Sequence, residues 1–321
     1  MVQPGDTWND DDGRAPTCAV EGAVAAPVPL DGIRGDLTCK APLAKLVWFK
    51  SGGQADWLFE PADLADLRLF LERLGGQLPV MALGLGSNLI IRDGGVPGIV
   101  VRLGKPFAGV EAGEDHVLTC GAGAPGVLVA SSARDAGIAG LEFLRGIPGT
   151  VGGFVRMNGG AYGSEVADVL ETCDVILPGG ELVTLAAGDL GYSYRHSKLP
   201  DGAIVVSARF RGRPGDPEAI GAEMERIAEA REASQPIRTR TGGSTFKNPQ
   251  GRKAWELVDA AGCRGMMLGD AQVSEKHTNF LVNTGTATSA DIEGLGELVR
   301  EKVYKTCGVM LDWEIQRVGR P

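Results

Sequence analysis

The chain has 321 residues, of which 43% are hydrophobic, so it is long enough for two or three domains around a large core. Its formal net charge of −9 argues against general binding to nucleic acid or to an anionic membrane surface. Six scattered cysteines and three histidines show no metal-ligand spacing, so we predict no metal site and a reducing compartment.

Residues 1–38 mix acids, proline and alanine without periodicity, and we predict that they form a disordered acidic tail. No apolar run is long enough to cross a bilayer, and the acidic start is unlike a signal peptide, so the expected location is cytoplasmic. Order is expected from Ala41, with a short strand and then a helix that begins at Pro61 and ends at Gly75.

A glycine-rich α/β region follows. Strands are expected at 79–83, 98–103, 116–120 and 203–210, a helix at 127–136 and a hairpin at 175–185. Gly121-Ala-Gly-Ala-Pro-Gly126 resembles a dinucleotide-binding turn, but the nearest acidic residue, Glu142, does not close a strand. We interpret these glycines as a packing turn.

Composition changes near Pro214, and we place a domain boundary at 210–218. Helices are expected at 218–233, at 254–261 and from a capping Ser289, with strands at 279–283 and 309–315. Taken alone, Glu314 would be the solvent-facing residue of that last strand, and Arg195 would be a surface arginine.

Two segments are unusual. Gly146–Gly163 holds many glycines, which suits either a run of tight turns or a backbone cradle for a nucleotide and its diphosphate. Residues 236–252 concentrate four basic side chains around a Gly-Gly-Ser-Thr turn. This arrangement favours an anion-binding site over a solvated basic loop.

Seven segments in this order resemble the UDP-N-acetylenolpyruvoylglucosamine reductases (UDP-N-acetylmuramate dehydrogenases), over roughly residues 41–319. They are Pro42-Leu-Ala with Gly52-Gly53, Gly84-Leu-Gly-Ser-Asn, Gly146-Ile-Pro-Gly-Thr-Val-Gly-Gly, Met157-Asn with Gly160-Ala-Tyr-Gly, Tyr194-Arg-His-Ser, Gly243-Ser-Thr-Phe-Lys-Asn-Pro and Gly308-Val-Met-Leu-Asp-Trp-Glu-Ile.

The resemblance implies an α+β chain with a p-cresol methylhydroxylase-like FAD-binding fold of two subdomains over residues 39–213. A C-terminal α+β substrate-binding domain would cover residues 214–321, with its last strand returning to the active site. FAD would be bound without a covalent bond, with NADPH as co-substrate. Because residues 213–235 leave room for one helix, the chain resembles the shorter subgroup, which lacks a tyrosine-bearing loop insertion.

The implied reaction reduces FAD with NADPH and then transfers hydride from flavin N5 to C3 of UDP-N-acetylglucosamine enolpyruvate. The product would be UDP-N-acetylmuramate for peptidoglycan synthesis. The family's catalytic positions fall on Arg195, Ser244 and Glu314. Arg195 would clamp the substrate carboxylate, Ser244 would give a proton to C2 with help from Lys247, and Glu314 would polarise the alkene if protonated or hydrogen-bonded to the carboxylate.

The resemblance also implies the binding residues. Cofactor contacts are expected at Gly84, Gly86, Ser87, Asn88, Gly146, Gly149, Thr150, Gly152, Gly153, Asn158, Ala161 and Tyr162. Substrate contacts are expected at Tyr194, Gly243, Lys247, Asn248 and Gln272. The chain departs from the family pattern at Phe154, where a small residue is usual, and at Lys50 and Gln54.

Two alternatives remain open at this point. One is another flavoprotein of the same fold, such as an oxidase acting on a sugar alcohol. The other is a nucleotide-sugar or anion-binding protein that keeps the fold without the chemistry.

Overall fold

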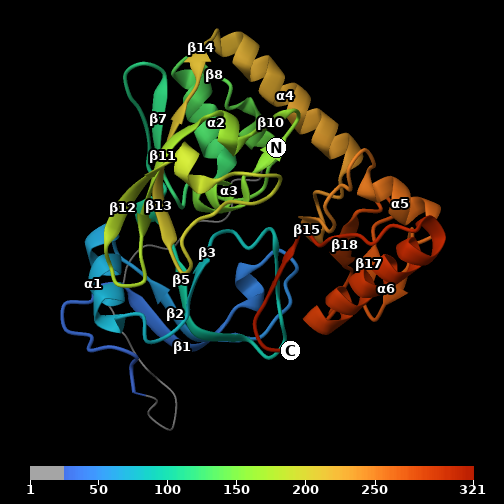
Figure 1. Cartoon of the computed structure of the whole chain (residues 1–321), viewed down its shortest axis with the longest axis horizontal. Coiled ribbons are helices and arrows are strands. Elements are labelled where there is room, and N and C mark those ends of the chain that lie inside the picture. The colour runs from blue at the N-terminus through green and yellow to red at the C-terminus, as the bar shows by residue number, and fades with distance from the viewer. Residues whose placement is uncertain (1–24) are drawn as a thin grey trace.

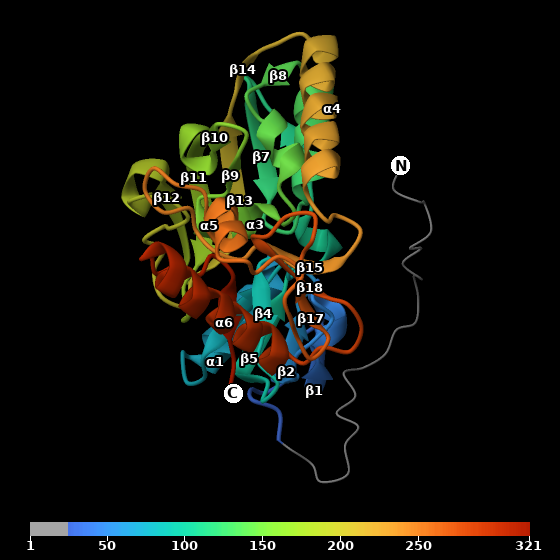
Figure 2. The same cartoon turned by 90° about the vertical axis from the view of Figure 1, so that its right-hand side faces the viewer.

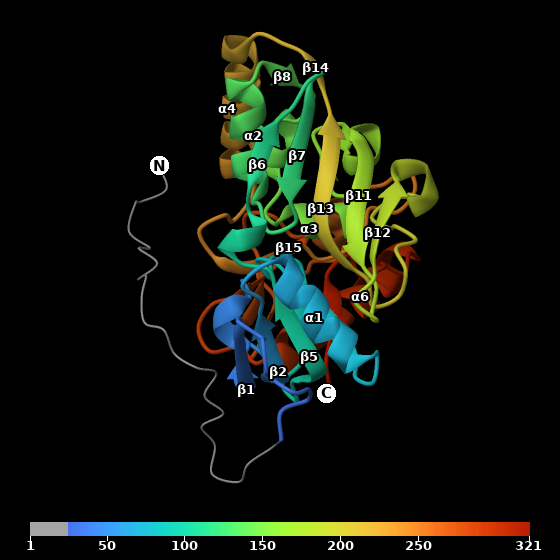
Figure 3. The same cartoon turned by 90° about the vertical axis from the view of Figure 1, so that its left-hand side faces the viewer.

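The computed structural model describes residues 25–321, and strand pairing in this part of the chain forms three main sheets (Figure 1). Figure 3 shows the first sheet below the second. The third part lies to the right of both in Figure 1, and its two helices face the viewer in Figure 2. Within residues 25–321 no helix is long and apolar enough to cross a membrane.

The first sheet has the strand order β1-β2-β5-β3 and carries one helix. Its elements are β1 (Asp36–Pro42), β2 (Gln54–Glu60), α1 (Leu64–Leu74), β3 (Val80–Leu83) and β5 (Val96–Arg102). β1 is antiparallel to β2, whereas β2 and β3 run parallel to β5. The rings of Phe59 and Phe70 stack with centroids 4.0 Å apart and join α1 to the sheet. The predicted helix start at Pro61 is wrong, because the Asp63 carboxylate accepts a hydrogen bond from the Asp66 N–H and caps α1.

The second sheet is antiparallel, in the order β12-β11-β13-β7-β6. Its elements are β6 (Val110–Ala112), β7 (Val117–Gly121), β11 (Leu170–Ile176), β12 (Leu182–Ala186), β13 (Ile204–Arg211), α2 (Gly126–Asp135) and α3 (Val151–Met157). Two short ribbons accompany it, β8 (Ile138–Ala139) with β14 (Arg213–Pro214), and β9 (Gly160–Ala161) with β10 (Ser164–Glu165). A Cβ on Gly121 would lie 2.1 Å from the Phe107 carbonyl oxygen, so this glycine serves close packing of a turn.

The long helix α4 (Pro217–Ser234) packs on the second part of the molecule, where Ile220 and Met224 join the core of the second sheet. The proposed substrate-binding domain, residues 214–321, therefore begins with a helix whose apolar face belongs to the preceding sheet. The functional division at residue 214 stays a prediction.

The third sheet has the order β15-β18-β17-β16. Its elements are β15 (Arg240–Ser244), α5 (Ala254–Ala260), β16 (Met267–Leu268), β17 (Ala271–Val273), β18 (Phe280–Asn283) and α6 (Ser289–Cys307). After α6 the chain returns to the first part, where β19 (Gln316–Val318) pairs in parallel with β4 (Leu89–Ile91). This return places residues 313–316 between the first and third parts.

Three boundaries differ from the sequence predictions. Residues 25–38 are ordered, since Val28 and Ile33 are buried in the first core and β1 begins at Asp36; residues 1–24 of the predicted tail lie outside the described residues. Thr288 caps α6, because its side chain accepts from the Asp291 N–H. The predicted strand at 309–315 is wrong, because this segment makes one isolated bridge instead of a ladder.

Polar contacts from the first part hold α6 in place. The Asp93 carboxylate accepts hydrogen bonds from the first two N–H groups of α6, Ser289 and Ala290, at 3.0 and 2.9 Å. Arg92 forms an ion pair with Glu293 one turn further along, at 2.8 Å. An acid at a helix N-terminus meets both the unpaired N–H groups and the helix dipole, so this contact fixes the third part against the first.

Gly296 on α6 gives a test of this packing. An alanine Cβ there would lie 2.1 Å from the Trp313 ring, so Gly296→Ala should lower the free energy of unfolding by about 1–3 kcal/mol. Gly221→Ala on α4 is the matched control: its Cβ would touch only the flexible Arg134 chain at 3.5 Å, and alanine should stabilise the helix by about 0.5–1 kcal/mol. Urea unfolding measures both, and effects of the same sign would contradict the packing.

Candidate active site

A cavity of about 540 Å³ lies where the three parts meet. Its wall includes fourteen of the residues that the sequence assigns to the site: Gly84, Gly86, Ser87, Asn88, Gly146, Gly149, Thr150, Gly153, Ala161, Tyr162, Arg195, Gly243, Ser244 and Glu314. They come from the loop after β3, the loop before α3, the β9 turn, the loop at 191–197, strand β15 and the chain after α6. The volume is typical of a site for a small organic ligand.

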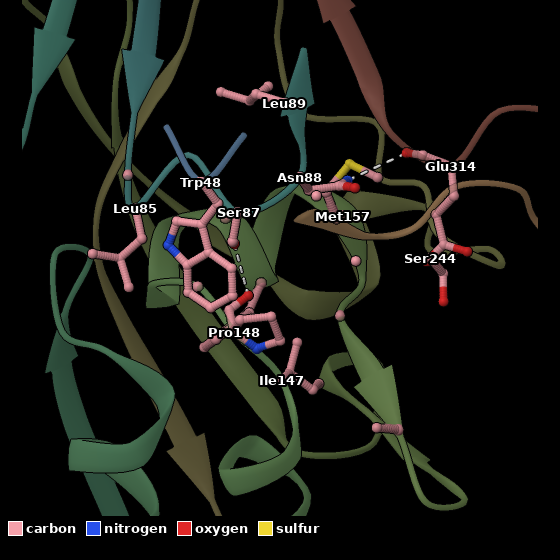
Figure 4. Close-up of a pocket in the computed structure, with 18 of the residues that line it drawn as sticks. Trp48, Leu85, Ser87, Asn88, Leu89, Ile147, Pro148, Met157, Ser244 and Glu314 are labelled. Carbon is pink, nitrogen blue, oxygen red and sulfur yellow. Dashed lines mark hydrogen bonds between the residues drawn. The ribbon is translucent and has the colours of Figure 1, made fainter. Parts of the chain in front are cut away.

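Two glycine loops form one wall of the cavity. A Cβ on Gly84 would lie 2.6 Å from Thr150 Oγ1, so the loops can approach only because this side chain is missing. The Ser87 hydroxyl donates to the Pro148 carbonyl at 2.9 Å and fastens the loops together (Figure 4). Gly153 also lines the cavity, and nothing lies within 4 Å of the place where its Cβ would stand. The wall therefore offers bare backbone to a ligand.

A largely buried ion pair lies in the cavity wall. Arg195 Nε lies 2.9 Å from Glu314 Oε1, and the two side chains are only 18% and 15% exposed. The same guanidinium donates to the carbonyl oxygens of Asn158 at 3.3 Å and Gly160 at 2.5 Å. The Tyr194 ring packs on it, with the guanidinium carbon 4.9 Å from the ring centroid. Together these contacts hold the Arg195 guanidinium in one orientation in the cavity wall.

Glu314 is placed by its backbone. Its N–H donates to the Thr245 carbonyl at 2.9 Å, and its carbonyl accepts from Asn88 Nδ2 at 3.2 Å (Figure 4). The first of these bonds sets Glu314 beside Ser244, as Figure 4 shows. Burial raises the pKa of the Glu314 carboxyl, although attraction to Arg195 and to Lys247 acts in the opposite direction. The carboxyl is thus easier to protonate than an exposed glutamate.

Six predicted contacts lie outside the cavity wall: Gly152, Asn158, Tyr194, Lys247, Asn248 and Gln272. Asn158 is fully buried; its side chain donates to the Ser193 carbonyl and accepts from the Ala167 N–H, so it supports the loop of Arg195. A Cβ on Gly152 would lie 3.2 Å from Ala122 of the second core. In this structure both residues take part in packing, and their contact with a cofactor stays a prediction.

The predicted substrate contacts Lys247, Asn248 and Gln272 also lie outside the described cavity wall. The Asn248 side chain accepts from the Ala254 N–H at the start of α5, and Gln272 is a residue of β17 paired with Met267. Lys247 comes near enough to Glu314 to affect its pKa. Of the expected substrate contacts, Gly243 alone is part of the described cavity wall.

Several wall residues were not predicted from the sequence. Trp48 presents its ring to the cavity beside Ser87 and Pro148 (Figure 4). Thr241 on β15 is buried, and its hydroxyl has no hydrogen-bond partner among the described residues. Arg231 enters the wall from the last turn of α4. Sequence patterns did not predict these residues as part of a site. Thr241 and Arg231 look like ordinary residues of a strand and a helix, and Trp48 looks like an ordinary apolar residue of a turn.

Comparisons with known proteins agree with this architecture. Residues 55–186 match a family of FAD binding domains, and residues 235–318 match the C-terminal domain of UDP-N-acetylenolpyruvoylglucosamine reductase. A protein of that name from Erythrobacter litoralis is 75% identical over 100% of this chain and 99% of its own length. Another, from Novosphingobium aromaticivorans, is 71% identical over 90% of this chain and 97% of its own.

A solved structure supports the same conclusion. The crystal structure of UDP-N-acetylenolpyruvylglucosamine reductase from Thermus caldophilus superposes with a TM-score of 0.78 at 34% identity, covering 89% of this chain and 99% of that one. The fold and the glycine-walled cavity therefore define a flavoprotein, an FAD-dependent oxidoreductase with the predicted α+β, p-cresol methylhydroxylase-like fold. The chain belongs to the UDP-N-acetylenolpyruvoylglucosamine reductase family.

The residues present fit a flavin dinucleotide. Bare backbone at Gly153 leaves space for a ligand, and glycine-rich loops of this kind can turn backbone N–H groups toward a diphosphate. The unpartnered hydroxyl of Thr241 needs a polar partner, which the carbonyls and ring nitrogens of a flavin could supply.

Removal of Arg195 should lower the free energy of unfolding, because it leaves the charged Glu314 carboxylate largely buried without a partner. The raised pKa means that the protonated form stabilises the fold at pH values below about 4.3, and that this benefit is lost as the pH rises through the folded pKa. In Arg195→Met the pKa should rise further, so the variant should lose about 3 kcal/mol or more at pH 8 and clearly less at pH 4.5.

Urea unfolding of the cofactor-free protein at both pH values measures this difference. Arg195→Met combined with Glu314→Gln is the control, in which the extra loss at pH 8 should disappear. An equal loss at both pH values in the single variant would show that the pair is not electrostatically coupled.

Proposed function

We propose that this protein uses FAD and NADPH to reduce UDP-N-acetylglucosamine enolpyruvate to UDP-N-acetylmuramate, a reaction of cytoplasmic peptidoglycan precursor synthesis. The observation that carries the proposal is the convergence of Arg195, Ser244 and Glu314 on one cavity from three distant segments. These are the positions to which the sequence resemblance assigns catalysis, and family membership makes the substrate class the expected one.

The glycine loops at 84–88 and 146–153 are proposed to hold FAD without a covalent bond, with Ala161 and Tyr162 at their edge. When bound, FAD supplies the hydride that the enolpyruvyl group receives at C3. The rest of the chemistry belongs to side chains of this chain: they must bind the substrate carboxylate, stabilise charge and deliver a proton.

Arg195 is proposed to bind the substrate carboxylate. A guanidinium can hold a carboxylate through two parallel hydrogen bonds, and it stabilises the negative charge that hydride addition pushes toward that group. In the structure the Arg195 guanidinium is paired with the Glu314 carboxylate. Protonation of Glu314, which burial favours, would release Arg195 to the substrate and remove the repulsion between two carboxylates.

Ser244 is proposed to give its hydroxyl proton to C2. It lies on the cavity wall at the end of β15, on the same side as Glu314 (Figure 4). A hydroxyl is a weak acid, so a positive charge near the alkoxide would aid the transfer. Lys247, three residues further on and electrostatically coupled to Glu314, is the proposed source of that charge.

The purified protein should be yellow, and its flavin absorbance band should be bleached by NADPH and restored by the enolpyruvyl substrate under anaerobic conditions. Anaerobic visible spectroscopy tests both half-reactions. Rapid recovery of colour with oxygen and release of peroxide would favour a flavoprotein oxidase. Binding of the nucleotide sugar without recovery of colour would favour a non-catalytic binding protein.

Ser244→Ala should leave flavin reduction by NADPH intact and slow reoxidation by substrate by about 10²–10⁴-fold, the usual contribution of a general acid. Stopped-flow absorbance separates the two half-reactions. Ser131→Ala on α2, outside the described cavity wall, is the control and should change neither rate. Equal slowing of both half-reactions would remove Ser244 from the proton-donor role.

A further inference from the structure

Arg231 is a cavity-wall arginine without a carboxylate partner. It stands on the last turn of α4, and Ser234, Gln235 and Ile237 continue the wall from there. Its Nε donates to Gln235 Oε1 at 3.2 Å, and no ion pair links it to an acid within residues 25–321. Arg195, in the same wall, is neutralised by Glu314.

The surroundings of Arg231 add positive charge. Burial lowers the pKa of its guanidinium, attraction to the Tyr162 phenol opposes this, and repulsion from Arg145 adds to it. Arg226 also acts on Tyr162, so two guanidinium groups lie near this phenol, and a third, that of Arg145, lies near Arg231, in a protein of net charge −9. A partly buried cation without a counter-charge is costly, and an anionic ligand would offset that cost.

The third arginine of the cavity wall is in a different position. Arg156 donates to the Ala203 carbonyl at 2.6 Å, and Asp201 lies near enough to raise its pKa, although burial lowers it more. Its charge therefore has an acid nearby. Arg231 is the wall arginine whose described surroundings leave its charge least compensated.

Arg231 comes from a different part of the chain than the proposed FAD cradle and meets that cradle at its edge residue Tyr162. It lies outside residues 55–186, which match the FAD binding domain family. The wall beside it is partly open, since Tyr162 and Ile237 are 39% and 38% exposed. A side chain at an open rim can meet a ligand that enters and leaves with every turnover, whereas a retained cofactor lies against the closed wall.

We infer that Arg231 binds the diphosphate of the nucleotide substrate at the mouth of the cavity. This inference rests on the proposed function, which requires a uridine diphosphate sugar. A guanidinium presents two parallel N–H donors to phosphate oxygens, so it binds a diphosphate through geometry as well as charge. The Gln235 side chain, already hydrogen-bonded to Arg231, keeps the fork in place.

The test uses the FAD-loaded full chain, with UDP and uridine as probes in calorimetric titrations. Arg231→Gln should weaken UDP binding by about 10–100-fold, the usual range for loss of a hydrogen bond to a charged group, and leave uridine binding unchanged. Arg231→Lys should recover part of the affinity. In turnover, Arg231→Gln should raise KM with little change in kcat.

Arg238→Gln is the matched control. Although Arg238 belongs to the basic segment at 236–252 that the sequence favoured as an anion site, it lies outside the described cavity wall. Its side chain is 84% exposed and pairs with Glu232 at 2.7 Å, so its loss should change UDP affinity by less than about twofold. Flavin content and the thermal unfolding midpoint of each variant verify that the cofactor and the fold are retained.

Three results would overturn the inference. If Arg231→Gln binds UDP as tightly as Arg238→Gln does, Arg231 does not bind the diphosphate. If Arg231→Gln and Arg231→Lys both fold but lose FAD, the arginine serves the cofactor. If the wild-type holoenzyme binds neither UDP nor the enolpyruvyl substrate, the proposed function fails together with the inference.

Discussion

The ion pair between Arg195 and Glu314 is the interaction on which the arrangement of the site depends. It joins residues 119 positions apart, one from a loop of the second part and one from the segment that follows α6. Each partner is held by further bonds, Arg195 by the Asn158 and Gly160 carbonyls and Glu314 by Thr245 and Asn88. Because both charges are buried, neither can move away without leaving the other unpaired, so the pair fixes the distance between the two walls of the cavity.

The rest of the fold makes this pair possible. Asp93 caps α6 and Arg92 binds Glu293, so the third part is attached to the first rather than left free on a linker. The chain then leaves α6, forms the bridge between Trp313 and Phe246, and enters β19 beside β4. Glu314 sits between two fixed pairings, one to the third part and one to the first. Its position is therefore a property of how the parts dock, and not of any regular element of its own.

The sequence predicted most elements and the family, and it failed where tertiary contacts decide. Alternation of apolar residues located the strands, and motif spacing located the glycine loops, because both are local properties. The strand expected around Glu314 does not exist, since the Glu314 N–H donates to the Thr245 carbonyl and the Glu314 carbonyl accepts from the Asn88 side chain, in place of a ladder. Asn158 was assigned to the cofactor by its motif, yet its amide holds the Arg195 loop. Arg231 reads as the charged face of an amphipathic helix, and nothing local reveals that this face turns into a cavity.

The two kinds of arginine in the cavity have different consequences for binding. Arg195 carries an internal counter-ion, so an incoming carboxylate has to compete with Glu314 for it, and it succeeds best when Glu314 is protonated. Arg231 carries none within the described chain, so a diphosphate meets a guanidinium that is already free to bind it. Under the proposed function, binding energy gained at the open rim can therefore be used to displace Glu314 at the reacting end. On this proposal the rim would hold the nucleotide, and the Arg195–Glu314 pair would open only for a ligand that also brings a carboxylate.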